Sequence, residues 1–186
     1  SNMNSLIEIT GSALIGSLLI VAILTSFYAV SDAQFSLSRS MVVQSKASAL
    51  AHIISSDIHN AGMNLPDSLD AVIEADSVQF IFLSQPFGAA FADTVRYYHD
   101  ERISQDGTEV PVLLRSSVID TDNILSVDYS RMTLVYFDSS GSETLIKDKI
   151  RSVEVSLFVG DFLENNNYRS RDFRQLRIYL ANIIND

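Results

Sequence analysis

Residues 9–30 read ITGSALIGSLLIVAILTSFYAV and contain neither a charged residue nor a proline. Glu8 precedes this stretch, and Asp32 is the next charged residue. As an α-helix, 22 residues rise about 33 Å, enough to cross a hydrocarbon core of about 30 Å. A signal peptide would have a basic n-region, a shorter apolar run and a small-residue cleavage site. We therefore expect a membrane-spanning helix over residues 4–31.

The chain after the apolar stretch changes to an amphipathic helical pattern. Apolar residues recur at spacings of three and four and form one stripe, made of Val43, Ala47, Leu50, Ile54 and Ile58. No glycine or proline interrupts residues 17–61, and Gly62 then stands where a left-handed C-cap would end the helix. The pattern predicts that residues 32–62 continue the helix and lay its stripe on a sheet.

Residues 63–186 carry the patterns of β-strands. Short β-branched or aromatic runs between polar turns predict strands at residues 77–84, 94–99, 110–115, 124–129, 132–137, 144–147, 152–159 and 175–183. Residues 124–129 and 132–137 are expected to pair across a short link at Ser130 and Arg131. Residues 160–172 (GDFLENNNYRSRD) are expected to form a loop that is disordered or contacts a partner. The alternation in residues 152–159 favours an antiparallel sheet with one covered face. We predict an α+β fold in which one long helix packs on an antiparallel β-sheet.

The totals exclude several classes of function. The chain has 186 residues, 23 of them acidic and 13 basic, and a net charge of −10. Such a balance argues against nucleic acid, because a protein that binds it needs a basic surface to neutralise phosphates. The chain has no cysteine, so disulfides, thiolate metal sites and cysteine nucleophiles are excluded.

No motif indicates an enzyme, a cofactor or a metal site. G-x-S-x-G, the P-loop, G-x-G-x-x-G and H-E-x-x-H are all absent. His52 and His59 are seven residues apart, whereas a helical metal pair uses a spacing of four. Residues 120–123 (DTDN) resemble part of a calcium loop but lack its glycine and terminal glutamate. A second acidic group comprises Asp161, Glu164 and Asn165. We expect ordinary acidic turns at both places, and no catalytic residue, metal or cofactor.

Three features of the chain form a pattern when taken in order. Residues 5–8 (SLIE) come directly before the uncharged helix, and residues 56–63 (SDIHNAGM) end the amphipathic segment with Asp57, Ala61 and Gly62. A third set follows in the β region: Tyr97-Tyr98, Leu114-Arg115, an aromatic run from Tyr136 to Gly141, Ile150 with Val153, Val155 and Leu157, and the closing segment LANI at residues 180–183. The order resembles that of type IV pilin-like proteins, in particular J-type minor pseudopilins of type II secretion and W-type (PilW-like) minor pilins.

The resemblance implies a structural subunit that helps initiate or cap a type IV pilus or a type II secretion pseudopilus. Glu8 matches the family's glutamate at the fifth mature position, which neutralises the N-terminal amine of an adjacent subunit during assembly. The implied partners are other pilin-like subunits, the membrane through residues 9–30, and the inner-membrane assembly machinery. The implied location is the bacterial inner membrane, crossed once, with residues 63–186 outside the cytoplasm, and a place at a filament tip.

Two alternatives stay open. Residues 1–3 are set apart because Ser1 and Asn2 before Met3 are typical of a tag remnant. The family's basic leader, which ends in glycine, does not precede Asn4. Either the natural start lies upstream, or the N-terminus is not processed in the usual way. The second function to weigh is a membrane-anchored extracytoplasmic binding domain that does not enter a filament.

Overall fold

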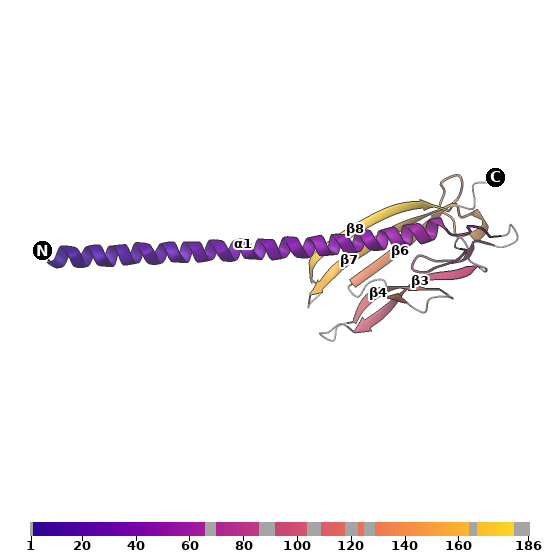
Figure 1. Cartoon of the computed structure of the whole chain (residues 1–186). Coiled ribbons are helices and arrows are strands. Elements are labelled where there is room, and N and C mark those ends of the chain that lie inside the picture. The colour runs from indigo at the N-terminus through magenta and orange to yellow at the C-terminus, as the bar shows by residue number, and fades with distance from the viewer. Residues whose placement is uncertain are drawn as a thin grey trace. The chain divides into compact units, whose positions relative to one another are not determined.

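A computed structural model describes residues 2–65, 70–85, 92–103, 109–117, 123–124, 129–163 and 167–180. The chain divides into two compact units, Ser1–Met41 and Val42–Asp186. One long helix, α1 (Asn2–His59), supplies the first unit and the beginning of the second, and all strands follow it (Figure 1). The predicted α+β fold, with one long N-terminal helix and antiparallel sheets, is confirmed.

In the first unit, α1 exposes its apolar side chains. Ile9, Ile23 and Phe27 are each about two-thirds exposed, at 65%, 66% and 65%. The hydroxyls in this stretch bond to their own helix: Thr25 Oγ1, for example, donates to Val21 O at 2.7 Å. Hydroxyls satisfied in this way present no unpaired donor to lipid. The helix is therefore long and apolar enough to span a membrane.

The second unit contains two antiparallel sheets (Figure 1). Sheet A has the strand order β1-β2-β3-β4-β5 and comprises β1 (Val72–Ala75), β2 (Phe80–Ser84), β3 (Asp93–Ile103), β4 (Glu109–Ser116) and β5 (Asn123–Ile124). Sheet B has the order β6-β7-β8 and comprises β6 (Tyr129–Phe137), β7 (Ser152–Leu163) and β8 (Asn167–Tyr179). A short 3-10 helix, η1 (Lys147–Lys149), precedes β7.

The core of the second unit lies between the end of α1 and the sheets. All members of the predicted apolar stripe are buried, with exposures between 0 and 5%: Val43, Ala47, Leu50, Ile54 and Ile58. They belong to one cluster with Phe80, Phe82 and Tyr97 of sheet A and with the inward residues of β7. Each buried Ile or Leu contributes about 1.5–3 kcal/mol by leaving water. Since α1 supplies one wall of this core, residues 42–59 cannot be detached without exposing it.

Hydrogen bonds fasten sheet A to the β6 edge of sheet B. Met132 N donates to His99 Nε2 at 2.8 Å, and Leu134 N donates to Ser77 O at 2.9 Å. Both N–H groups point away from β7, where an edge strand would otherwise leave them unpaired. The β6 edge is therefore covered by the other sheet.

The predicted pairing of residues 124–129 with residues 132–137 is wrong. Tyr129–Phe137 is a single strand, and Asn123–Ile124 pairs with β4 instead. Ser130, taken as part of a link, is fully buried within β6, where its Oγ accepts a hydrogen bond from Leu113 N at 2.9 Å. Composition alone cannot reveal a backbone donor that satisfies a buried serine.

The predicted loop over residues 160–172 is also wrong. β7 and β8 continue through it as paired strands, in the register Gly160↔Arg171 to Leu163↔Asn167, and residues 164–166 lie outside the described residues. Backbone pairing between the two strands, which composition does not reveal, forms this part of the sheet.

The first strand of sheet A was missed. β1 (Val72–Ala75) was not predicted, and the strand expected over residues 77–84 begins only at Phe80. Residues 76–79 turn between the two strands, and Asp76 N donates to Gln79 O at 2.9 Å. The β region also forms two sheets rather than the single sheet that was expected.

Candidate functional site

Glu8 lies on α1 directly before the apolar stretch, and its side chain is exposed. Among the described residues no ion pair to Glu8 occurs. A carboxylate held at the centre of a bilayer costs about 2.5–3.5 kcal/mol, and less near the interface. A cation supplied by another molecule would therefore stabilise this helix in a membrane.

Small residues follow Glu8 on the same helix. A Cβ added at Gly11 or Gly16 would meet no atom within 4 Å in the part of the chain that the structure describes. Small residues in lipid allow a second helix to approach closely. This part of α1 combines a negative charge with an apolar surface whose small side chains would allow a neighbouring helix to pack closely.

The second group of predicted residues, Asp57, Ala61 and Gly62, lies at the end of α1. Gly62 has a φ of +77°, which confirms the predicted left-handed cap. Its N–H donates to Leu83 O at 2.8 Å, so the cap also joins the helix to β2. Ala61 is fully buried, and a larger side chain there would enter the core. Glu8 and this group belong to different units of the chain.

Asp57 fixes the last turns of α1 to sheet A. Its Oδ2 accepts hydrogen bonds from Tyr97 Oη on β3 and from Arg115 Nε on β4, both at 2.6 Å. Asp57 and Arg115 are only 23% and 20% exposed. The sequence motif had singled out all three residues, but nothing in the sequence showed that they meet.

Burial and charge both act on this cluster. Burial, followed by the Asp57 carboxylate, raises the pKa of the Tyr97 phenol, so Tyr97 remains a hydrogen-bond donor. Burial alone would lower the pKa of Arg115, but the hydrogen bond and charge of Asp57 raise it overall. Asp57, Tyr97 and Arg115 are called the Asp57 cluster below. The cluster holds one carboxylate, one cation and one neutral phenol, and it fixes the end of α1 to sheet A.

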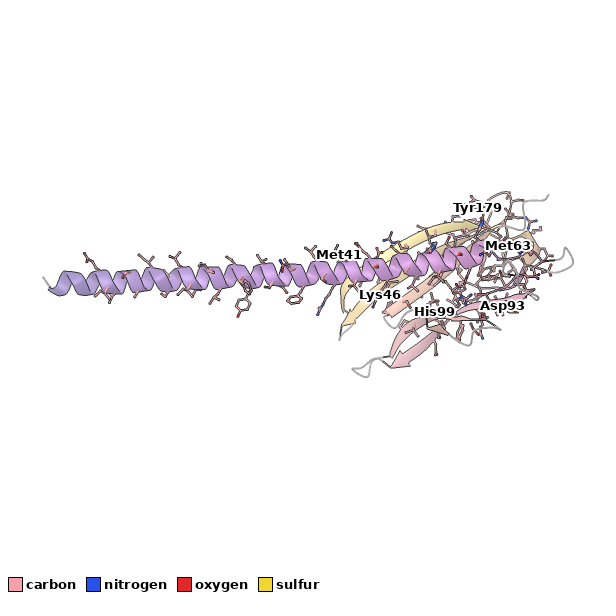
Figure 2. The ribbon with its side chains drawn as sticks, viewed as in Figure 1. Met41, Lys46, Met63, Asp93, His99 and Tyr179 are labelled. Carbon is pink, nitrogen blue, oxygen red and sulfur yellow. The ribbon has the colours of Figure 1, made fainter. Side chains whose placement is uncertain are left out.

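Two histidines join distant segments. His59 Nδ1 lies 3.0 Å from Tyr179 O, which connects the end of α1 to the end of β8. Tyr179 and the second histidine, His99, are labelled in Figure 2. His99 Nε2 accepts from Met132 N, so its proton is on Nδ1, which faces the Val78 backbone. Burial, and then the charge of Arg131, lowers the pKa of His99 and favours this neutral form. Neither connection was predicted, because each joins residues that lie far apart in the chain.

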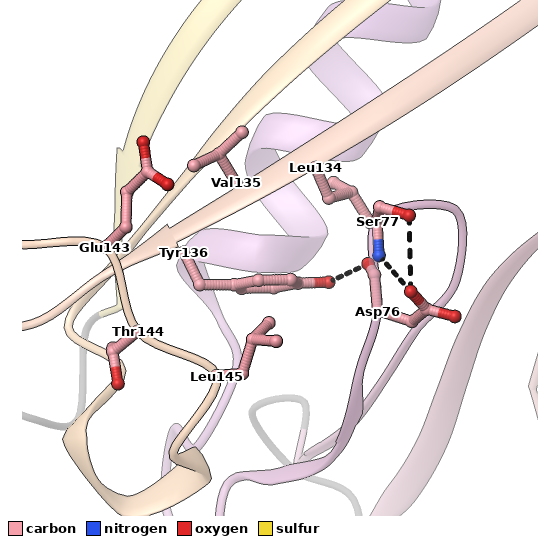
Figure 3. Close-up of a pocket in the computed structure, with 8 residues that line it drawn as sticks. All are labelled: Asp76, Ser77, Leu134, Val135, Tyr136, Glu143, Thr144 and Leu145. Atoms are coloured by element: carbon pink, nitrogen blue, oxygen red, sulfur yellow. Dashed lines mark hydrogen bonds between the residues drawn. The ribbon is translucent and has the colours of Figure 1, made fainter.

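An open groove lies beside Tyr136, where β6 meets the β1–β2 turn (Figure 3). Its volume is about 420 Å³. The lining residues are Asp76, Ser77, Leu134, Val135, Tyr136, Glu143, Thr144 and Leu145. Tyr136 Oη donates to Asp76 O at 2.8 Å, and the exposed Leu145 lies next to the ring (Figure 3). The groove thus has an apolar floor.

Only acidic charges line this groove. Asp76 and Glu143 stand on its two sides, and no basic residue is among the described residues that line it (Figure 3). Burial raises the pKa of the Tyr136 phenol, which keeps it protonated and bound to the turn. Two of the lining residues are joined, because Ser77 Oγ donates a hydrogen bond to Asp76 Oδ1 at 3.2 Å (Figure 3).

The side chains of the possible calcium ligands lie outside those that the structure describes. Residues 120–122 and 164–165, and the side chain of Asp161, lie outside the described residues. Among the side chains that are described, no three His, Asp or Glu residues gather as they would around a metal ion.

No family model, no curated protein and no solved structure matches this chain.

Proposed function

We propose that the chain is a pilin-like minor subunit, or pseudopilin, that anchors in a bacterial inner membrane and helps initiate or cap a type IV pilus or a type II secretion pseudopilus. The observation that carries the proposal concerns α1. An exposed stretch without charged residues follows Glu8, and the same helix then continues into the core of an α+β unit. A helix that serves both purposes can join neighbours in lipid and display a folded unit on one side.

The role is structural and non-catalytic in this proposal. Glu8 pairs with the N-terminal amine of an adjacent subunit, because an isolated carboxylate in lipid is costly and an opposite charge relieves it. Gly11 and Gly16 let the helices approach. The Asp57 cluster then fixes the folded unit to the helix, so that a force on one is transmitted to the other.

The proposal is tested by cross-linking in the cells that naturally produce the chain. A photo-reactive amino acid at Leu14, which is 62% exposed, should capture other pilin-like subunits, identified by mass spectrometry. Glu8→Gln should reduce that capture at least tenfold, whereas Asp32→Asn, the next acidic residue on α1, should not. The proposal would be rejected if the chain with the photo-reactive residue at position 14, and with Glu8 retained, captured no pilin-like protein.

The alternative is a membrane-anchored extracytoplasmic binding domain that stays outside any filament. The groove beside Tyr136 favours it, because an apolar floor between two carboxylates suits a cationic ligand with an apolar part. If deletion of the protein leaves filament assembly unchanged and cross-linking at Leu14 captures no pilin-like protein, this second function gains the stronger support.

A further inference from the structure

The two edges of sheet B differ in what covers them. On β6, the outward N–H groups of Met132 and Leu134 are bonded to sheet A. β8 is the last strand on the other side, and among the described residues no strand pairs with its outer edge. His59 occupies one carbonyl there, that of Tyr179, at the very end of the strand. An open edge of this length is a surface on which another chain can pair.

The direction of the β8 backbone follows from its pairing with β7. Leu180 N donates to Arg151 O, in the same register that pairs Ile178 with Val153. Because antiparallel pairs alternate, the odd-numbered residues of β8 direct N–H and C=O away from β7. These are Arg171, Phe173, Gln175, Arg177 and Tyr179, the residues whose side chains are exposed.

These exposed side chains combine aromatic rings with positive charge. Phe173 and Tyr179 are 59% and 62% exposed. Arg177 lies over the Phe137 ring, with its guanidinium carbon 4.1 Å from the centroid, and approaches Tyr179 at 5.9 Å. Its Nε also donates a hydrogen bond to Ser152 Oγ at 3.3 Å, and among the described residues no salt bridge to Arg177 occurs.

The charge of β8 is opposite to that of the molecule. Its 13 residues include four arginines and one aspartate, a net charge of +3, in a chain whose net charge is −10. Charged side chains often protect an edge strand from unwanted pairing. Two exposed aromatic residues on the same strand do not fit that purpose, because they add apolar surface to the edge.

We propose that the open edge of β8 pairs with an extended acidic segment of a partner protein and adds it to sheet B as a fourth strand. The backbone groups of the odd-numbered residues supply the pairing, Arg171 and Arg177 select acidic side chains, and Phe173 and Tyr179 contact apolar ones. The inference concerns the second unit alone and does not depend on what α1 does in the membrane.

The probe for the test is a fluorescein-labelled octapeptide of alternating Glu and Val, and binding to the full chain in dodecyl maltoside micelles is followed by fluorescence anisotropy. We expect saturable binding that weakens with salt, and no binding of the matching Lys-Val peptide. The double variant R171E/R177E should bind at least tenfold more weakly. The control variant K147E/K149E makes the same change in net charge on η1 and should bind like the unmodified chain.

A second probe separates strand pairing from simple charge attraction. The same Glu-Val peptide with every second amide N-methylated keeps its charge but cannot form the ladder, and it should not bind. Equal binding of both peptides, or unchanged binding by R171E/R177E, would overturn the proposal. The proposal would also be overturned if analytical ultracentrifugation found a dimer that R171E/R177E converts to a monomer, since a second copy of the chain would then occupy the edge. Binding of polygalacturonate without binding of the peptide would assign the surface to an anionic polysaccharide instead.

Discussion

At the scale of single residues, Asp57 carries the most consequence because it bonds two strands from one carboxylate oxygen. Asp57→Asn keeps the size of the side chain but leaves Arg115, which is 20% exposed, without its counter-charge. We expect the free energy of unfolding to fall by about 1–3 kcal/mol. Chemical denaturation of the full chain in micelles measures it.

The matched control for this variant is Asp172→Asn. Asp172 accepts a hydrogen bond from Arg174 Nε at 2.7 Å; Asp172 is only 18% exposed, but its partner Arg174 is 41% exposed. Exposed pairs contribute about 0–1 kcal/mol, so the control should change stability much less. Equal losses in the two variants would show that the Asp57 cluster is an ordinary surface ion pair.

His99 makes stability depend on pH. Its folded pKa is below the ordinary value of 6.5, so the unfolded chain takes up a proton at a higher pH than the folded chain does. The contribution is therefore complete above about pH 6.5 and is lost as the pH falls through the folded pKa. Denaturation curves at pH 7.5 and pH 5.5 should show the loss, and His99→Gln should reduce it.

A suitable control for the pH effect is His52→Gln, because His52 is exposed on α1. That variant should keep the full pH dependence. If instead His99→Gln leaves the pH dependence of the free energy of unfolding unchanged, the hydrogen bond from Met132 N to His99 Nε2 does not join the sheets as described.

At the scale of elements, adjacent residues on α1 test how the helix packs. Ile54 is fully buried, whereas Ile53 is 39% exposed. Ile54→Ala should lower the free energy of unfolding by about 2–5 kcal/mol, because it removes buried methyl groups and leaves a cavity. Ile53→Ala should cost under about 1 kcal/mol. Similar losses at both positions would mean that the helix face is assigned wrongly.

The sequence predicts an element correctly when the pattern lies within one segment. The prediction fails when the structure of a segment depends on a residue that is distant in the chain. The apolar stripe from Val43 to Ile58 and the cap at Gly62 follow from periodicity and backbone preference, and both were predicted. Ser130 looked like a link because its partner, Leu113 N, lies on another strand. β1 is too short, at four residues, to show an alternation of its own.

The same reasoning explains what was missed in the candidate site. Asp57, Tyr97 and Arg115 were each noted as motif residues, but their meeting depends on the register of β3 against β4, in which Tyr97 faces Arg115. The groove beside Tyr136 forms where two sheets join, and the division into two sheets was not predicted. Contacts between elements can be predicted only when the fold is known, whereas helix caps and apolar stripes can be predicted from one segment alone.

At the scale of the whole molecule, each of the two units has a surface that the described residues of the chain leave uncovered. The first unit exposes the uncharged stretch of α1 at residues 9–30, directly after Glu8. The second exposes the basic, aromatic edge of β8. In a filament subunit the first surface would meet helices in the membrane, and the second would meet an acidic neighbour outside it. The two can be tested separately, since their variants lie in different units.

The central claim is that this chain is a pilin-like subunit, and the most direct test is the N-terminus of the protein isolated from its native membranes. Intact mass and N-terminal sequencing should find a trimmed, methylated amino group at Asn4, which places Glu8 at the fifth position. An N-terminus that is neither trimmed nor methylated would contradict the claim, and the membrane-anchored binding domain would then be the better account.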